Sequence, residues 1–98
     1  MKDIDAKECE LQVLVCTNDR TDRTCCKAVG GQEFFEKLKR KLKETGKNST
    51  RWATRTGCLG YCNAVGTTVT IHRFGEAPKW YSEVTDKDFD FIWNEVTK

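Results

Sequence analysis

Cysteine is the residue type that most constrains this chain, because five of its six cysteines fall into two groups. The first group is Cys16 with the adjacent pair Cys25 and Cys26, and the second is Cys58 with Cys62. Four thiolates that converge on one point form a site for a soft metal centre, and few other arrangements explain such a pattern in a small chain. The sequence therefore predicts a metal centre held by cysteines from two separate segments.

The length and the N-terminal residues favour one soluble domain. The 98 residues suit a single domain over 1–98, burying somewhat over ~60% of its unfolded surface. Residues 1–10 form a mixed-charge segment without the apolar stretch of a secretion signal, and no hydrophobic run approaches the ~18 residues of a membrane span. We therefore expect a cytoplasmic protein without membrane contact. Thiols stay reduced in the cytoplasm, so the cysteines are better interpreted as ligands or redox groups than as three disulfides.

The charge pattern argues against a nucleic-acid partner. The chain carries 17 basic and 15 acidic residues, a formal net charge of +2. The basic stretch from Lys37 to Lys43 lacks interleaved exposed aromatic residues, so a solvated helix face is the simpler interpretation and we expect no nucleic-acid binding. A third interpretation is that this face steers an acidic redox partner, since complementary charge mainly raises association rates.

Hydrophobic patterning predicts four strands and two main helices. The predicted strands are Leu11–Val15, Thr50–Thr56, Thr67–Arg73 and Lys79–Val84, and the predicted helices are Gln32–Glu44 and Phe89–Val96. Apolar residues recur at spacings of three and four in both helices, and Thr85 with Asp88 forms a plausible capping box before the second. The order of a strand, a helix, a strand, a hairpin and a terminal helix is that of a thioredoxin-like α/β domain with a central four-stranded sheet.

Both cysteine groups follow predicted strand ends, where loops present ligands. Cys16 ends the first strand, and Cys58 follows the second. The predicted helix after Cys26 adds a helix N-terminus, whose partial positive charge favours thiolate over thiol. Each group therefore stands where a loop can present its cysteines as ligands.

Glycines surround the second cysteine group. Gly57, Gly60 and Gly66 allow the backbone to wrap closely and to direct N–H groups at sulfur, a contact that tunes a metal centre. Each of them also has a simpler interpretation as a residue that only forms a turn.

The cysteine spacing distinguishes between the possible types of metal centre. Structural zinc sites usually use short C-x2-C pairs, but here nine residues separate Cys16 from Cys26 and three separate Cys58 from Cys62. A thioredoxin-type exchange enzyme needs C-x2-C after the first strand, and a Rieske centre needs two histidines where this chain has only His72. The spacings of plant-type and bacterial ferredoxins are absent as well. A two-iron cluster with a different spacing fits best, and zinc stays open as an alternative.

Three segments together resemble the thioredoxin-like [2Fe-2S] ferredoxins. These are Cys26-Lys-Ala-Val-Gly30 before a helix, Gly57-Cys58-Leu59-Gly60-Tyr61-Cys62, and Trp80-Tyr81 before the C-terminal helix. The resemblance covers roughly residues 11–96, and the joint presence of the second and third segments is quite specific. The small iron-sulfur subunits of NADH dehydrogenases and related hydrogenases share this fold.

The resemblance implies one [2Fe-2S] cluster per chain, ligated by Cys16, Cys26, Cys58 and Cys62. Cys25 is the alternative to Cys26, which is preferred because Gly30 completes the C-x3-G pattern of the family. The resemblance also implies one-electron transfer rather than enzyme activity, redox partner proteins, and a homodimer.

The chain departs from the family pattern in three ways: it has the extra Cys25, a threonine at position 67 where the family often has proline, and a longer hairpin around residues 74–78. Two other functions stay open. One is an iron-sulfur subunit fixed in a larger oxidoreductase, although the chain lacks the extra N-terminal helical segment that such subunits often carry. The other is a zinc-stabilised or metal-free thioredoxin-fold interaction domain.

The remaining cysteine and the tryptophans have structural interpretations. Cys9 precedes the first strand and is better interpreted as a single thiol than as a ligand. We expect Trp80 and Tyr81 to be strand residues that pack on a helix, with Trp52 and Trp93 in the core.

Overall fold

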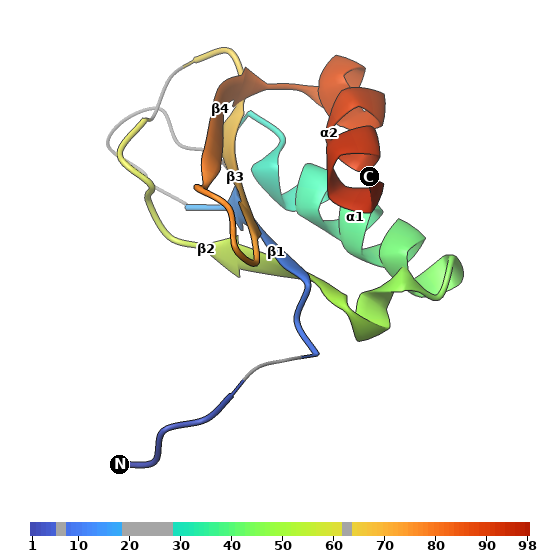
Figure 1. The fold of residues 1–98 in the computed structure, drawn as a ribbon. Helices are drawn as coiled ribbons and strands as arrows, with labels where there is room; N and C mark the ends of the chain where they lie inside the picture. The colour runs from blue at the N-terminus through green and yellow to red at the C-terminus, as the bar shows by residue number, and fades with distance from the viewer. Residues whose placement is uncertain (6–7, 19–28, 62–63) are drawn as a thin grey trace.

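The computed structural model describes residues 1–5, 8–18, 29–61 and 64–98, and its elements match the predicted ones to within one residue at each end. In chain order these are β1 (Leu11–Cys16), α1 (Gly31–Glu44), β2 (Arg51–Thr56), β3 (Thr67–Arg73), β4 (Lys79–Val84) and α2 (Phe89–Thr97) (Figure 1). Short 3-10 turns at Lys47–Ser49 and Asp86–Asp88 precede β2 and α2. Thr85 and Asp88 form the expected capping box, which satisfies backbone groups that the start of a helix leaves unpaired.

The four strands form one mixed sheet in the order β2-β1-β3-β4. β1 is parallel to β2 and antiparallel to β3, and β3 is antiparallel to β4. Both helices lie on the same side of this sheet (Figure 1). The predicted four-stranded sheet with two main helices is therefore confirmed.

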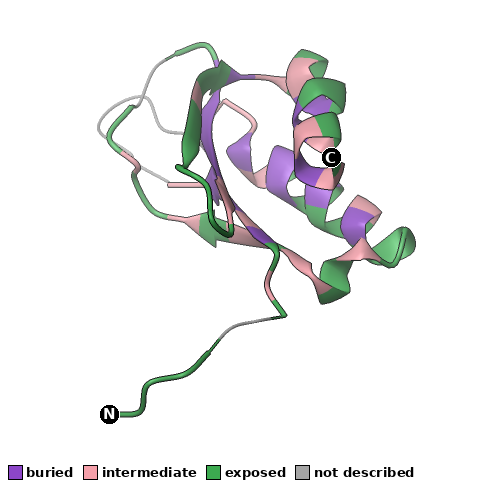
Figure 2. Ribbon diagram, in the orientation of Figure 1, coloured by how far each residue is buried: buried purple, intermediate pink, exposed green. Residues whose placement is uncertain are grey.

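The core lies between the sheet and the two helices. Side chains alternate between the two faces of a strand, and every second residue of β1, namely Leu11, Val13 and Val15, is buried in the core cluster. The helices contribute their apolar stripes, and the rings of Phe34 in α1 and Phe89 in α2 meet edge to face at 5.5 Å. Figure 2 shows this buried layer facing inward, with exposed residues on the outer sides of the helices.

Neither helix has the character of a membrane span. The buried residues of α1 occupy one face, and charged residues occupy the other. Nowhere in the described ranges does a helix combine the length and the apolar character needed to cross a bilayer.

The opposite face of the sheet, which we call the open face, is not covered by any helix among the described residues (Figure 1). By alternation it carries Gln12, Leu14, Trp52, Thr54, Thr56, Thr68, Thr70, His72, Trp80 and Ser82. Charged residues make up 33% of the chain, yet none of these ten side chains is acidic or belongs to a lysine or arginine. Exposed Glu83 lies beside Ser82, at the irregularity where β4 departs from strict alternation.

The open face corrects two expectations about the tryptophans. Trp80 was expected to pack on a helix and Trp52 to lie in the core, but both lie on the open face and are 52% and 40% exposed. Tyr81 and Trp93 behave as expected, since both are partly buried against the core. The alternation that places Tyr81 toward the helices necessarily places its neighbour Trp80 on the other side.

Candidate metal centre

The parallel pairing of β1 and β2 brings two of the predicted ligands to one end of the sheet. In this register Cys16, the last residue of β1, lies opposite Thr56, the last residue of β2. Cys58 follows Thr56 by two residues, a chain length of at most about 7 Å. Cysteines that are 42 positions apart in the sequence therefore lie at neighbouring strand ends.

Cys16 is held rigidly at this end. It is 1% exposed, and its carbonyl accepts a buried hydrogen bond from Thr67 Oγ1 at 2.7 Å. On the other side the backbone N–H of Thr17 donates to the Thr56 carbonyl at 3.0 Å. Both neighbouring strands thus fix the position of the Cys16 backbone, and a ligand in this position is preorganised.

Cys58 is exposed and already accepts a backbone hydrogen bond. The N–H of Gly60 donates to Cys58 Sγ at 3.3 Å, and Gly60 has a φ of +91°, a conformation that costs other residues roughly 1–2 kcal/mol. The predicted approach of a glycine N–H to sulfur is confirmed at this position. Such a donor stabilises negative charge on sulfur.

Residues 57–61 are tied to the sheet by contacts from β3 and β4. The ring of Tyr61 meets the ring of Trp80 edge to face at 5.9 Å, and Thr68 Oγ1 donates a long hydrogen bond of 3.5 Å to the Tyr61 carbonyl. Beyond the second cysteine group, a Cβ at Gly66 would collide with the Val84 carbonyl, so this glycine is required by close packing. The open face therefore supports the segment that carries Cys58.

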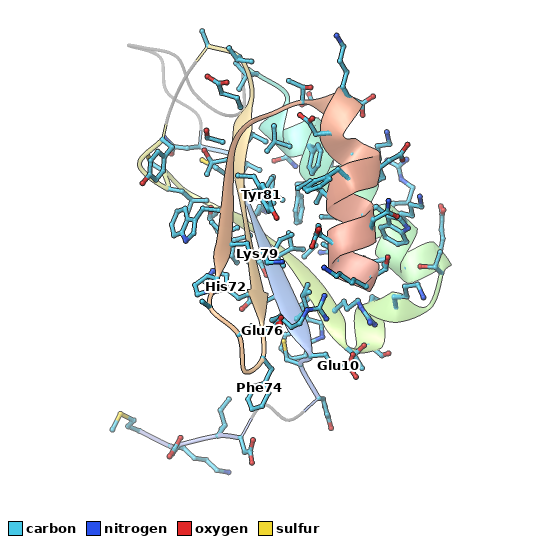
Figure 3. All side chains as sticks on the ribbon, turned by 45° about the horizontal axis from the view of Figure 1, so that its top comes forward. Glu10, His72, Phe74, Glu76, Lys79 and Tyr81 are labelled. Carbon is cyan, nitrogen blue, oxygen red and sulfur yellow. The ribbon has the colours of Figure 1, made fainter. Side chains whose placement is uncertain are left out.

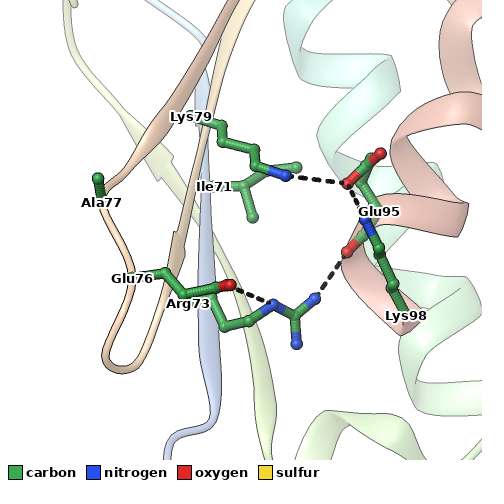
Figure 4. Close-up of a pocket in the computed structure, with 7 residues that line it drawn as sticks. All are labelled: Ile71, Arg73, Glu76, Ala77, Lys79, Glu95 and Lys98. Carbon is green, nitrogen blue, oxygen red and sulfur yellow. Dashed lines mark hydrogen bonds and ion pairs between the residues drawn. The ribbon is translucent and has the colours of Figure 1, made fainter.

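A hollow of about 280 Å³ lies at the other end of the sheet, between the β3–β4 hairpin and α2. Arg73 donates to the Glu95 carbonyl at 2.9 Å, while Lys79 and Lys98 lie 3.6 and 3.7 Å from the Glu95 carboxylate (Figure 4). Figure 3 shows Glu76 and Lys79 on this hairpin, with Phe74 and Glu10 near its tip. Because Arg73 pairs with Leu11 and not with Cys16, this hollow is separate from the candidate centre. The Lys79–Glu95 ion pair and the Arg73 hydrogen bond attach the hairpin to α2.

The sequence matches no known protein family, and no curated protein matches it significantly. Solved structures do match. A crystal structure of the wild-type thioredoxin-like [2Fe-2S] ferredoxin from Aquifex aeolicus is similar with a TM-score of 0.72 and 26% identity, covering 89% of this chain and 84% of that one. A cysteine-to-serine variant of that ferredoxin gives a TM-score of 0.73 at 26% identity, with 90% and 87% covered. A third structure of a thioredoxin-like [2Fe-2S] ferredoxin from this organism gives 0.74 at 26% identity, with 92% and 82% covered. The chain has the fold of the thioredoxin-like [2Fe-2S] ferredoxins.

The residues at the Cys16 end fit the thiolate chemistry of such a ferredoxin. Iron-sulfur clusters are held by cysteine thiolates, and N–H donors to sulfur tune them. Cys16 supplies a fixed thiol, and Cys58 supplies an exposed one that already accepts an N–H bond. Two of the four ligands predicted by the resemblance thus lie at neighbouring strand ends.

The other predicted ligands, Cys26 and Cys62, and the alternative Cys25 lie outside the described residues. Within the described residues no three His, Cys, Asp or Glu side chains come together, which is expected when only Cys16 and Cys58 of the predicted set are described. The four-cysteine ligand set therefore stays a prediction.

Cys9 lies away from the candidate centre. It is partly buried just before β1, where its thiol lies 3.6 Å from the Leu11 carbonyl. The length of β1, about 17 Å at 3.3 Å per residue, separates it from Cys16. This position agrees with the prediction that Cys9 is not a ligand of the ferredoxin-type centre.

Two supporting residues of the ferredoxin-type site were not identified from the sequence. Thr67 anchors the carbonyl of Cys16. The only sign of this role in the sequence is a threonine at a position where the family often has proline. Trp80 contacts Tyr61, and the Trp-Tyr motif marked the position without indicating this contact. Proline at position 67 would have no hydroxyl to donate, so this chain anchors Cys16 with a contact that proline cannot make.

Proposed function

We propose that the protein is a one-electron carrier that binds one [2Fe-2S] cluster through Cys16, Cys26, Cys58 and Cys62. The observation that carries the proposal is the convergence of Cys16 and Cys58 at one end of the sheet, with the Gly60 N–H on Cys58 Sγ. The similarity to [2Fe-2S] ferredoxins over about nine-tenths of the chain supports it.

Different residues would have different roles in such a carrier. When bound, the cluster supplies the one-electron chemistry, and the protein supplies binding and tuning. Cys16, buried between two strands, would fix the inner side of the cluster. Cys58 lies at the surface, where a partner protein can approach, and the Gly60 N–H would stabilise the additional negative charge of the reduced state.

A redox titration followed by visible absorption tests this function. We expect a reversible one-electron reduction at low potential, because four thiolates without histidine leave a high negative charge on the cluster. An irreversible reduction, or a protein that cannot be reduced, would contradict the carrier function. Elution of the native protein only within a large complex would instead favour the iron-sulfur subunit of an oxidoreductase, and a colourless protein that binds zinc would favour the interaction domain.

We further propose that two copies associate through the open face, and that the partner proteins of the dimer are redox proteins. The scarcity of charge on the open face supports this, because identical surfaces with few charges meet with little electrostatic repulsion, and exposed tryptophan is enriched at interfaces. Ser82→Glu would place two like charges in this interface and shift sedimentation toward the monomer. Ser49→Glu, at an exposed position before β2, is the matched control and should leave sedimentation unchanged. Equal sedimentation of the Ser82→Glu variant and the wild type would contradict this interface.

A further inference from the structure

The surface between α1 and β2 is hollowed along much of its length. Two adjoining hollows of about 460 and 250 Å³ share Lys39 and Ala53 as lining residues. The first also includes Arg55, and the second includes Lys43. We call these two hollows together the α1–β2 groove.

Cations that pair with no carboxylate of the described residues line this groove. Lys39, Lys43 and Arg55 are exposed, and in the described part of the chain none of them forms an ion pair with a carboxylate. A fourth cation, Arg51, is already engaged with Glu10 at 3.7 Å. Glu36 also lines the first hollow, where its carboxylate accepts a hydrogen bond from Gln32 at 3.0 Å. Cations still outnumber this single carboxylate, and because grouped exposed charges attract counter-charges most strongly, the groove favours an acidic ligand.

The groove lies beside a sheet edge that no described strand pairs with. β2 is the outermost strand on this side, and the carbonyls of Thr50 and Thr56 accept hydrogen bonds from the β1 side. Because backbone groups alternate in direction along a strand, the N–H and C=O groups of Arg51, Ala53 and Arg55 point outward. An extended chain can therefore hydrogen-bond to this edge, and the small side chain of Ala53 leaves space for its approach.

We propose that the α1–β2 groove binds an extended acidic segment of the redox partner, which adds to β2 as a further strand. Strand addition obtains affinity from main-chain hydrogen bonds and specificity from alternate side chains. The main chain of the segment pairs with the outward groups of Ala53, and its carboxylates meet Lys39 and Arg55. This inference rests on the proposed function, because it names the partner of the electron carrier.

The location of the groove serves electron transfer. Arg55 precedes Thr56, the residue opposite Cys16, and lies three residues before Cys58. A segment on the β2 edge therefore extends to the end of the sheet that carries the candidate centre. Docking at this edge brings the partner next to the exposed Cys58 and not next to the distant β3–β4 hairpin.

A labelled peptide of alternating glutamate and threonine tests the proposal by fluorescence anisotropy at low ionic strength. The double variant Lys39→Glu with Arg55→Glu should weaken binding at least about tenfold, since charge-assisted contacts become repulsive. The matched control is Lys2→Glu with Lys87→Glu, two exposed lysines elsewhere on the chain, which changes the net charge by the same amount. Equal loss of affinity in both double variants, or no loss in the first, would overturn the proposal.

Amide hydrogen exchange provides a measurement that needs no variant. The peptide should slow exchange at the N–H groups of Ala53 and Arg55, and it should leave Lys87 unchanged. Unchanged exchange at Ala53 would contradict strand addition. Both measurements are made on protein whose iron and sulfide content is known. Peptide binding to protein without a cluster would contradict the proposed function alone. A bound cluster without peptide binding would contradict this inference alone.

Discussion

Cys16 lies directly opposite Thr56 in the parallel pair of β1 and β2, two residues before Cys58. Because parallel strands finish at the same end of a sheet, this register places ligands from distant segments together. The Thr67 hydrogen bond to Cys16 and the Gly60 hydrogen bond to Cys58 lie at the same end. The candidate centre thus depends on contacts from three strands.

Gly60→Ala should lower the reduction potential of the loaded protein. An alanine at a φ of +91° is strained by roughly 1–2 kcal/mol, so the backbone moves away and the N–H that donates to Cys58 Sγ is lost. Voltammetry of the variant measures the shift. A potential equal to that of the wild type would contradict the role of this hydrogen bond.

Two other glycines provide the controls for Gly60. Gly75→Ala introduces a similar strain at a φ of +82° in the β3–β4 hairpin, so it should destabilise the fold without changing the potential. Gly57→Ala, where a Cβ meets open space and φ is ordinary, should change neither quantity. A potential that moves with Gly75→Ala would show that general destabilisation, and not the hydrogen bond, causes the effect.

Trp80→Ala should accelerate release of the cluster to an excess of chelator. The variant removes the ring that contacts Tyr61 between the two cysteines of the second group, an interaction of about 0.5–1.5 kcal/mol. Loss of visible absorbance with time measures the rate. Trp80→Phe should restore most of the wild-type behaviour, while Trp52→Ala, which removes the other exposed tryptophan of the open face, should not accelerate release.

Thr67→Val should lower the stability of the fold, whereas Thr70→Val should not. Both threonines are fully buried in β3. Thr67 donates to the Cys16 carbonyl, whereas the Thr70 hydroxyl finds no hydrogen-bond partner among the residues that the structure describes. Removing the paired hydroxyl should cost about 1–2 kcal/mol, and removing the unpaired one should be neutral or stabilising. Urea denaturation compares the two variants, and an equal loss of stability would contradict the difference between the two hydroxyl groups.

The choice between adjacent cysteines is also testable. Cys26→Ser should abolish the cluster, whereas Cys25→Ser should retain it, because only Cys26 precedes Gly30 at the family spacing. Cys9→Ser is the control, since Cys9 lies at the other end of β1. Loss of the cluster in Cys25→Ser alone would show that the ligand is the preceding cysteine.

The sequence predicted the elements well because their periodicity reflects burial. The alternation in β1 and the three-and-four spacing in α1 each correspond to one buried face. The glycine between Cys58 and Cys62 also indicated close approach to sulfur, because Gly60 can adopt a φ that other residues avoid.

Trp52 and Trp80 could not be placed from the sequence for a physical reason. Alternation shows that Trp80 and Tyr81 occupy opposite faces, but it does not show which face the helices cover. The contacts of Trp80 with Tyr61 and of Thr67 with Cys16 join segments that are 19 and 51 positions apart, and only the tertiary structure brings them together.

The presence of a [2Fe-2S] cluster is tested by quantifying iron and acid-labile sulfide after anaerobic reconstitution and recording EPR spectra before and after reduction. We expect about two irons and two sulfides per chain and an EPR signal that appears only on reduction. Zinc without sulfide, or iron that gives no signal on reduction, would contradict it.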